Sequence, residues 1–271
     1  MANFCIVTDN SAEFFDSKFH LLEELTLTNH HLSFGGKKCK FPAFGKKEID
    51  LPLTVGSLAS PNVTSPEPSE FSDLFTNLLM KNRNIIYVSM ASGLSSANEN
   101  AIIASKKNDH LGNIHIYDSC SISLGLGYIA SDALKSVSVG SDFNQIDLCI
   151  RNVINRRYLD YSQSLSSEML GLISIYSLED GRLNPLEKVK SYPLLIDFFL
   201  EYLAEFDSLE MIGFVQSINS PEKKPLSTFI HENFPDAKFK QEKLSAIMST
   251  LLGPRGIGLF IVEKGYAAEK Q

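Results

Sequence analysis

The sequence predicts an α/β fold built from two α/β domains. The first is expected to be a doubly wound, mostly parallel sheet, and the second a smaller mixed domain. Short apolar, β-branched runs alternate with amphipathic stretches through the first half of the chain, a pattern typical of strand–helix units that build a parallel sheet. The pattern changes within residues 157–166, so we place the domains at residues 1–160 and 161–271.

In the first half, apolar runs predict strands at residues 4–7, 25–32, 85–88 and 114–117. Helices are expected at residues 70–81, 99–105, 126–137 and 142–157, and a further one is expected to open at Ser11. Ser69 is the expected cap of the helix at 70–81. Residues 35–53 are rich in Gly, Lys and Phe, which indicates a long loop or a hairpin.

In the second half, apolar runs without clean alternation occupy residues 167–177, and a turn is expected at 179–185. A strongly apolar helix is expected at 194–206, and a second helix near 224–233 lies between strands at 209–216 and 237–241. The glycine-rich turn at 253–258 leads into a final strand at 259–262.

Bulk properties exclude several classes of protein. The 271 residues carry a net charge of −7 with a pI near 5.4, which argues against a nucleic-acid-binding surface. The N-terminus lacks the pattern of a signal peptide, and no apolar run approaches the roughly 18 residues of a membrane span. We therefore expect a cytoplasmic protein whose four scattered cysteines are reduced.

Four polar turns are expected near the ends of predicted strands, at residues 8–11, 64–65, 92–96 and 118–119. Ligands of open parallel sheets bind outside the carboxyl ends of the strands, so these turns are expected to line one crevice. The turn that begins at Ser92 is the most informative, because it joins a strand to a helix N-terminus and predicts anion binding. The simpler alternative is that its hydroxyls only cap the helix.

Catalytic patterns are sparse. Ser92 or Ser95 would be the nucleophile of a serine hydrolase, but the surroundings are not G-x-S-x-G and none of the six histidines suggests itself as a partner. No zinc-ligand spacing or Walker loop is present, and we expect neither a metal nor a cofactor. Asp9 and Asp118 would hold a metal only if their strands adjoin, and such residues more often accept backbone N–H bonds.

Several segments, taken in order, carry a family resemblance. Residues 6–11 (IVTDNS) are similar to an I-x-T-D-S opening, residues 64–71 to T-S-Q-P-S before a Phe-bearing helix, and residues 91–97 (ASGLSSA) to S-S-G-L-S-G-T. Asp118-Ser119 matches a D-S turn, and residues 252–258 are similar to a terminal G-P-G motif. Together these segments resemble the DegV family of bacterial fatty-acid-binding proteins.

The resemblance implies a carrier of a long-chain fatty acid, whose acyl chain lies in an apolar tunnel covered by the C-terminal domain. It implies that the carrier is not itself an enzyme, and that its partner is the catalytic subunit of a fatty acid kinase, which makes an acyl phosphate. The carboxylate-binding residues implied by the motifs are Thr64, Ser65, Ser92, Gly93 and Ser95. Those implied as neighbours of the headgroup or pocket are Asp9, Ser119 and Arg255.

Three departures from the family pattern keep alternatives open. Leu251 stands where the family often has a histidine, Arg255 replaces a usual glycine, and an L-x-x-L-x-x-G-G-R-I helix is not found between residues 157 and 172. One alternative is a diverged, shortened relative that binds another amphiphile or a protein partner. The other is the serine hydrolase considered above.

Overall fold

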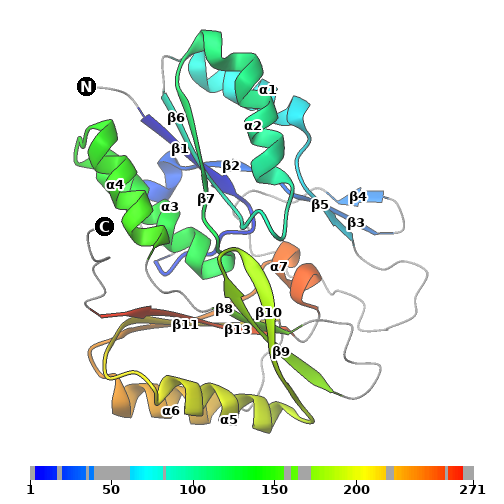
Figure 1. The fold of residues 1–271 in the computed structure, drawn as a ribbon, viewed down its shortest axis with the longest axis vertical. Helices are drawn as coiled ribbons and strands as arrows, with labels where there is room; N and C mark the ends of the chain where they lie inside the picture. Colours follow the sequence, from blue (N-terminus) through cyan, green and yellow to red (C-terminus); the bar gives the residue numbers. More distant parts are fainter. Residues whose placement is uncertain are drawn as a thin grey trace. The chain divides into compact units, whose positions relative to one another are not determined.

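The computed structural model describes residues 4–16, 20–34, 37–39, 62–81, 84–155, 160–163, 172–217, 223–253 and 256–264. The chain divides into unit 1, residues 1–49 and 54–155, and unit 2, residues 50–53 and 156–271 (Figure 1). Each unit combines helices with sheet, and unit 1 contains a parallel sheet. The fold class predicted from the sequence is confirmed. No helix in the described ranges is both long and apolar enough to span a bilayer.

The main sheet of unit 1 has four parallel strands in the order β2 (Thr26–Thr28), β1 (Phe4–Asp9), β6 (Asn84–Ser89) and β7 (Ile114–Asp118). All six residues of β1 and five of the six in β6 are buried. Strands covered on both faces are continuous apolar runs rather than alternating ones. This is why β1 and β6 could be recognised in the sequence.

Helices cover both faces of this sheet (Figure 1). They are α1 (Pro68–Leu79) and α2 (Ala97–Asn108) on one face, and α3 (Ser123–Ser138) and α4 (Phe143–Ile154) on the other. Cys5 and Val7 belong to a core cluster with the buried side chains of α1 and α2. Phe4 points the opposite way along the pleat and stacks on Phe143 of α4, with ring centroids 6.1 Å apart.

The strand order creates a topological switch point between β1 and β6. From β1 the chain passes through the 3₁₀ helix η1 (His20–Glu24) to β2 on one side, whereas β6 and β7 follow on the other side. A second 3₁₀ helix, η2 (Asp109–Leu111), precedes β7. The loops that leave two neighbouring strands at such a point diverge, and the gap at their carboxyl ends is where ligands of this class of sheet bind.

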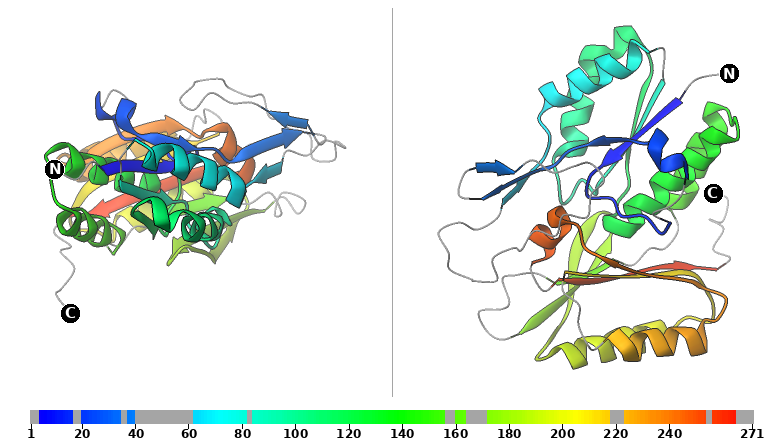
Figure 2. Two further views of the ribbon diagram at one scale, coloured as in Figure 1. Left: turned by 90° about the horizontal axis from the view of Figure 1, so that it is seen from above. Right: turned by 180° about the vertical axis from the view of Figure 1, so that it is seen from behind.

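A second, antiparallel sheet in unit 1 has the order β4 (Lys37–Cys39), β3 (His31–Phe34) and β5 (Asn62–Thr64). In both views of Figure 2 its blue strands project from the rest of unit 1. The single strand expected at residues 25–32 is therefore wrong, because the chain leaves the main sheet after Thr28. The side chain of Asn10 fixes this break, since it accepts a bond from the His30 N–H at 2.9 Å and donates to the His30 carbonyl at 3.2 Å.

Two local expectations are corrected. Glu67, not Ser69, caps α1, because Pro68 occupies the first turn and Glu67 forms a capping box with Glu70. No helix opens at Ser11, because residues 11–16 run irregularly and the Glu13 N–H donates to the Ser123 carbonyl. Strand β5 had no expected counterpart. Within the range expected as a loop or hairpin, residues 37–39 form β4, and the residues beyond them lie outside the described part.

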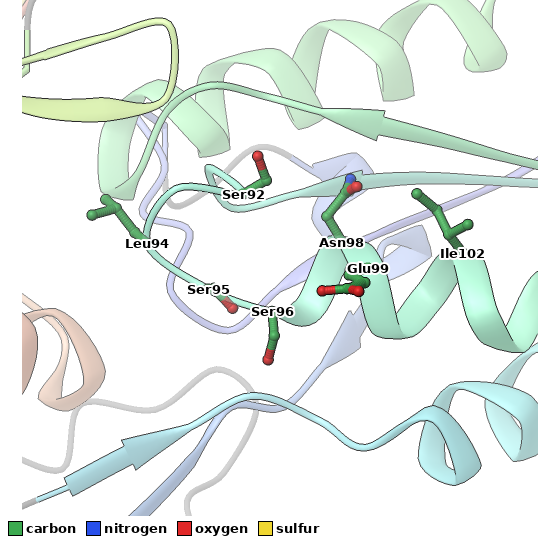
Figure 3. Close-up of a pocket in the computed structure, with 7 residues that line it drawn as sticks. All are labelled: Ser92, Leu94, Ser95, Ser96, Asn98, Glu99 and Ile102. Carbon is green, nitrogen blue, oxygen red and sulfur yellow. The ribbon is translucent and has the colours of Figure 1, made fainter.

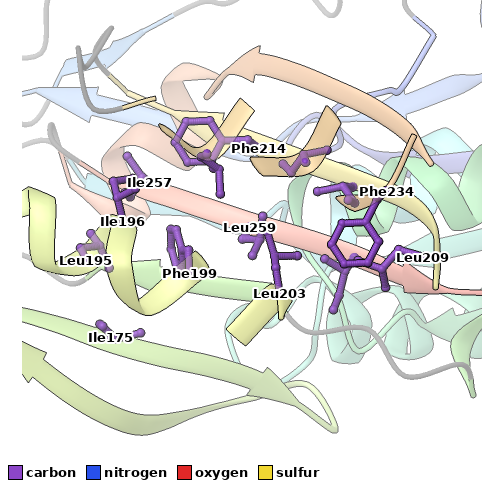
Figure 4. Packing of buried hydrophobic residues seen from close by; sticks show 14 of the residues in the cluster. Ile175, Leu195, Ile196, Phe199, Leu203, Leu209, Phe214, Phe234, Ile257 and Leu259 are labelled. Atoms are coloured by element: carbon purple, nitrogen blue, oxygen red, sulfur yellow. The ribbon is translucent and has the colours of Figure 1, made fainter. Parts of the chain in front are cut away.

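Unit 2 contains an antiparallel sheet β10 (Arg182–Val189), β9 (Ile173–Glu179), β8 (Asp160–Gln163) and a mixed sheet β12 (Lys238–Lys243), β11 (Leu209–Gln216), β13 (Ile257–Glu263). The helices are α5 (Tyr192–Leu203), α6 (Lys223–Asn233) and α7 (Ala246–Leu252). Phe199, Phe214 and Leu259 pack at the centre of a core shared by α5, β11 and β13 (Figure 4). Helix α7 was not expected from the sequence.

The turn expected at residues 179–185 is much tighter in the structure. Asp180 and Gly181 both have positive φ, 50° and 74°, and Arg182 already begins β10. Two consecutive residues with positive φ are what a two-residue hairpin needs, and Asp-Gly is a favoured pair for it. The segment between residues 157 and 172, where the sequence lacks the helix of the family pattern, falls mostly outside the described residues.

Gly127 lets the start of α3 approach the segment that follows β1. A Cβ atom at this position would overlap the carbonyl oxygen of Glu13, which is backbone and cannot rotate away. The same segment is held by the Glu13 N–H bond to Ser123 and by a Ser123 hydroxyl bond to the Glu13 carboxylate. Glycine is therefore required at position 127 because of the close approach of the Glu13 backbone, and not because of its φ angle.

We expect Gly127→Ala to lower the free energy of unfolding by about 1–3 kcal/mol, because an extra methyl group in a closely packed site forces a backbone shift. Chemical denaturation followed by circular dichroism measures this. Ser138→Ala at the exposed end of α3 is the matched control and should change stability by less than about 0.5 kcal/mol. Equal stability of Gly127→Ala and the control would show that the contact can relax without cost.

Candidate functional site

Asp9 lies at the carboxyl end of β1, at the switch point. Its carboxylate is fully buried, and each oxygen accepts one hydrogen bond: Oδ1 from the Tyr87 hydroxyl at 2.6 Å and Oδ2 from the Met90 N–H at 2.5 Å. Burial raises the pKa of Asp9 from its usual value, while its hydrogen-bond donors act in the opposite direction. The carboxylate thus ties the end of β1 to the loop that leaves β6.

The loops after β6 and β7 are joined in the same manner. The Asp118 carboxylate accepts bonds from the Ser92 N–H at 3.2 and 3.3 Å and from the Cys120 N–H at 2.9 Å. Ser119 is buried, and its hydroxyl donates to the Ser121 carbonyl at 3.1 Å. In the structure both side chains shape the turn after β7, as polar side chains in turns commonly do.

Two of the hydroxyls that the motifs pointed to lie in contact. The Oγ atoms of Ser65 and Ser95 are 2.8 Å apart, and the Ala97 N–H at the start of α2 donates to Ser95 Oγ at 3.1 Å. Ser65 reaches this position because β5 pairs with β3, with Thr64 opposite His31, and Ser65 follows directly. It therefore arrives through the small antiparallel sheet and not from the carboxyl end of a main-sheet strand.

His30 completes this group, and sequence reasoning missed it. Its Nε2 atom lies 2.8 Å from Ser95 Oγ, and its Nδ1 atom lies 4.0 Å from Asp9 Oδ1. The residue is 3% exposed, and burial lowers the pKa of the imidazole, which favours the neutral ring. No sequence motif marks this position; only the pairing of β3 with β5 shows that His30 comes beside Ser95.

Ser95 also lines a surface pocket at the N-terminus of α2 (Figure 3). The other lining residues are Ser92, Leu94, Ser96, Asn98, Glu99 and Ile102. Thr64, Ser92 and Gly93 are exposed, and the Ser92 N–H is engaged by Asp118. Arg255 lies outside the described residues. The structure thus joins Ser65 with Ser95, whereas Asp9 connects to them through His30 alone.

Chemically, this arrangement suits an anion that is held by neutral donors. Hydroxyl groups and the first N–H groups of α2 converge on one loop, where the helix dipole is positive. The described residues contain no group of three or more His, Cys, Asp or Glu side chains that could hold a metal ion. The fold and the site together define a class: a two-unit α/β protein with a polar, hydroxyl-rich site at the switch point of a parallel sheet.

Comparison with known proteins specifies this class further. Residues 56–161 match the family model described as uncharacterised proteins of the DegV family. A DegV domain-containing protein of Caldanaerobacter subterraneus subsp. tengcongensis is 23% identical over 239 residues, which cover 81% of this chain and 84% of that protein. A DegV domain-containing protein of Staphylococcus aureus is 23% identical over 220 residues, or 74% of this chain and 78% of the relative. The resemblance to the DegV family predicted from the sequence is confirmed.

Solved structures share the fold. A fatty-acid-binding DegV family protein of Streptococcus agalactiae matches with a TM-score of 0.79 at 16% identity, over 98% of this chain and 100% of that one. A DegV family protein of Thermus thermophilus, described by its fatty acid binding, matches with a TM-score of 0.78 at 14% identity, over 96% of this chain and 99% of that one. The Fatty Acid Kinase (Fak) B3 protein of Streptococcus pneumoniae, loaded with linoleic acid, matches with a TM-score of 0.76 at 17% identity, over 96% of this chain and 99% of that one.

We expect Asp9→Ala to lower the free energy of unfolding by at least about 2 kcal/mol, because it leaves the Tyr87 hydroxyl and the Met90 N–H buried without an acceptor. Urea denaturation measures the effect, and Asp73→Ala on the exposed face of α1 is the control. If Asp9→Ala matched this control in stability, the carboxylate would not be a structural link between β1 and β6.

Proposed function

We propose that this protein binds a long-chain fatty acid, with the carboxylate at the hydroxyl-rich loop before α2 and the tail in an apolar tunnel. The observation that carries the proposal is the contact between Ser65 and Ser95 at the N-terminus of α2. It is supported by the shared fold with proteins described as binding fatty acids. Thr64, Ser92 and Gly93 complete the proposed headgroup loop.

The energetics of such a ligand fit neutral donors. A hydrogen bond to a charged group contributes about 1.5–3 kcal/mol, and each buried methylene group about 0.8 kcal/mol. A tail of a dozen or more carbons therefore supplies most of the affinity, and the headgroup site needs only to satisfy and orient the carboxylate. The pocket at this loop presents the hydroxyl groups of three serines together with Asn98, Glu99 and two apolar side chains.

The proposal includes a partner. One of the similar structures is a B3 protein of a fatty acid kinase. We propose that this chain likewise presents its fatty acid to a kinase subunit, which phosphorylates the carboxylate, and that it is not the catalyst. ATP is the phosphoryl donor of kinases, so the proposed role places the protein in the cytoplasm. Copurification with a fatty acid kinase catalytic subunit tests the partnership. A fatty-acid-loaded protein that forms no complex with that subunit would restrict the proposal to binding.

A second candidate function rests on one observation, the contact between Ser95 Oγ and His30 Nε2 with Asp9 behind the ring. A serine hydrolase needs such an array. However, the Asp9–His30 separation of 4.0 Å exceeds a hydrogen bond, and both Asp9 oxygens already accept bonds from other groups. Labelling of Ser95 by a fluorophosphonate, abolished in Ser95→Ala, would support hydrolysis; an unlabelled protein would exclude it.

The headgroup assignment predicts that Ser65→Ala combined with Ser95→Ala weakens binding of oleate by at least about tenfold, since the Ser65 donor to the charged carboxylate and the Ser95 hydroxyl that contacts it are both lost. Isothermal titration calorimetry on protein freed of copurified lipid measures the dissociation constant. Ser105→Ala, at the far end of α2, is the control and should bind like the wild type.

Ser95 also accepts the first N–H of α2, and losing such a hydrogen bond costs about 1 kcal/mol of stability, so thermal melting of each variant must accompany the titration. Ser65→Ala alone keeps this hydrogen bond and provides a second test. Unchanged oleate affinity in a folded double variant would show that the carboxylate binds elsewhere.

A further inference from the structure

The ring of His30 is held rigidly between two polar groups. The backbone of His30 is fixed on both sides by Asn10, and its side chain is almost completely buried. Nε2 contacts Ser95 Oγ, whereas Nδ1 has no hydrogen-bond partner among the described residues. A buried ring nitrogen without a partner is unusual and calls for an explanation in terms of charge.

Asp9 supplies that explanation. Burial raises the pKa of Asp9, whereas His30 and the hydrogen bonds from Tyr87 and Met90 lower it and favour the ionised form; Oδ1 lies 4.0 Å from Nδ1. A lone pair on Nδ1 would face this negative charge, whereas an N–H group would be attracted to it. The proton of the neutral ring therefore belongs on Nδ1, which leaves Nε2 as an acceptor.

The hydroxyl chain then has a defined direction. Ser95 Oγ already accepts the Ala97 N–H, so one lone pair and one hydrogen remain for His30 and Ser65. With Nε2 as acceptor, Ser95 donates to His30 and Ser65 donates to Ser95. Both hydroxyl hydrogens are then used inside the protein, and neither is offered to an anion.

Protonation of Nε2 reverses the direction of these hydrogen bonds. The imidazolium donates to Ser95, Ser95 donates to Ser65, and the hydroxyl hydrogen of Ser65 becomes available to a bound carboxylate. The ring then carries both protons, one toward Asp9 and one toward the hydroxyls. The positive charge lies between two negative groups, the buried Asp9 and the ligand.

We propose that binding of a carboxylate to the Ser65–Ser95 pair is coupled to the uptake of one proton by His30. The inference rests on the proposed function, since it specifies how the fatty acid headgroup is recognised. By linkage, a ligand that requires the protonated ring binds more tightly as the pH falls.

Burial and the neighbouring charged groups determine the pKa of His30. Burial has the largest influence and lowers this pKa, Asp9 on β1 raises it, and the neighbouring His31 lowers it. His31 is itself paired with Glu70 of α1 at 2.8 Å, and Tyr87 of β6 lies on the far side of Asp9. Free protein therefore holds a neutral ring near neutral pH, and the added ligand charge raises the pKa of His30. As the pH increases from the pKa of His30 in the free protein to its higher pKa in the complex, the dissociation constant rises by up to about tenfold per pH unit.

The test uses decanoate, because it is soluble and a simple carboxyl group titrates near pH 4–5, outside the range of about pH 6–8.5 to be studied. Calorimetry in two buffers of different ionisation enthalpy counts the protons taken up by delipidated protein. Wild type should take up as much as one proton per decanoate. His30→Gln keeps an N–H donor toward Ser95 and should bind with no uptake and no pH dependence. His31→Gln, at the adjacent histidine, should behave like the wild type.

Absence of binding of both decanoate and the longer oleate in the wild type at every pH overturns the proposed function. Binding of decanoate without proton uptake overturns the proposed coupling but not the proposed function. Loss of proton uptake in His31→Gln has the same meaning. If His30→Gln does not fold, the nitrogen chemical shifts of His30 in wild-type protein decide: both ring nitrogens must become protonated when decanoate is added. A ring that stays neutral contradicts the inference.

Discussion

The buried carboxylate of Asp9 is the interaction on which the rest of unit 1 depends. It lies at the end of the central strand β1, and it holds the Tyr87 side chain of β6 and the backbone at Met90. The loop that follows β6 is therefore fixed at its first residue, which in turn positions Ser95 at the start of α2. A buried charge is tolerated here because each oxygen accepts a hydrogen bond.

The same carboxylate links architecture to recognition. It faces the imidazole of His30, which lies between the end of the main sheet and the hydroxyls of Ser95 and Ser65. The proposed headgroup site contains no lysine or arginine among the described residues that form the network. The donors of these residues are neutral in the free protein. Under the proposed function, selectivity for an amphiphile comes from its tail.

Much of this arrangement could be predicted from local sequence. The buried runs of β1 and β6 and the Asp118–Ser119 turn were evident, and residues 209–216 form β11 with the expected bounds. Motif order pointed to Ser65 and Ser95. The contact between them could not be derived, because it depends on β5 pairing with β3, two short strands far apart in sequence. His30 was missed for the same reason, and also because the break after Thr28 depends on the side chain of Asn10.

The central claim is that a fatty acid carboxylate binds at the Ser65–Ser95 pair. The most direct test is a crystal structure of the protein with a fatty acid brominated at its terminal carbon, whose anomalous signal locates the tail independently of the headgroup. We expect a carboxylate oxygen within hydrogen-bond distance of Ser65 Oγ, with the tail enclosed by apolar side chains. A carboxylate located away from this loop, or a brominated tail exposed to solvent, would contradict the central claim.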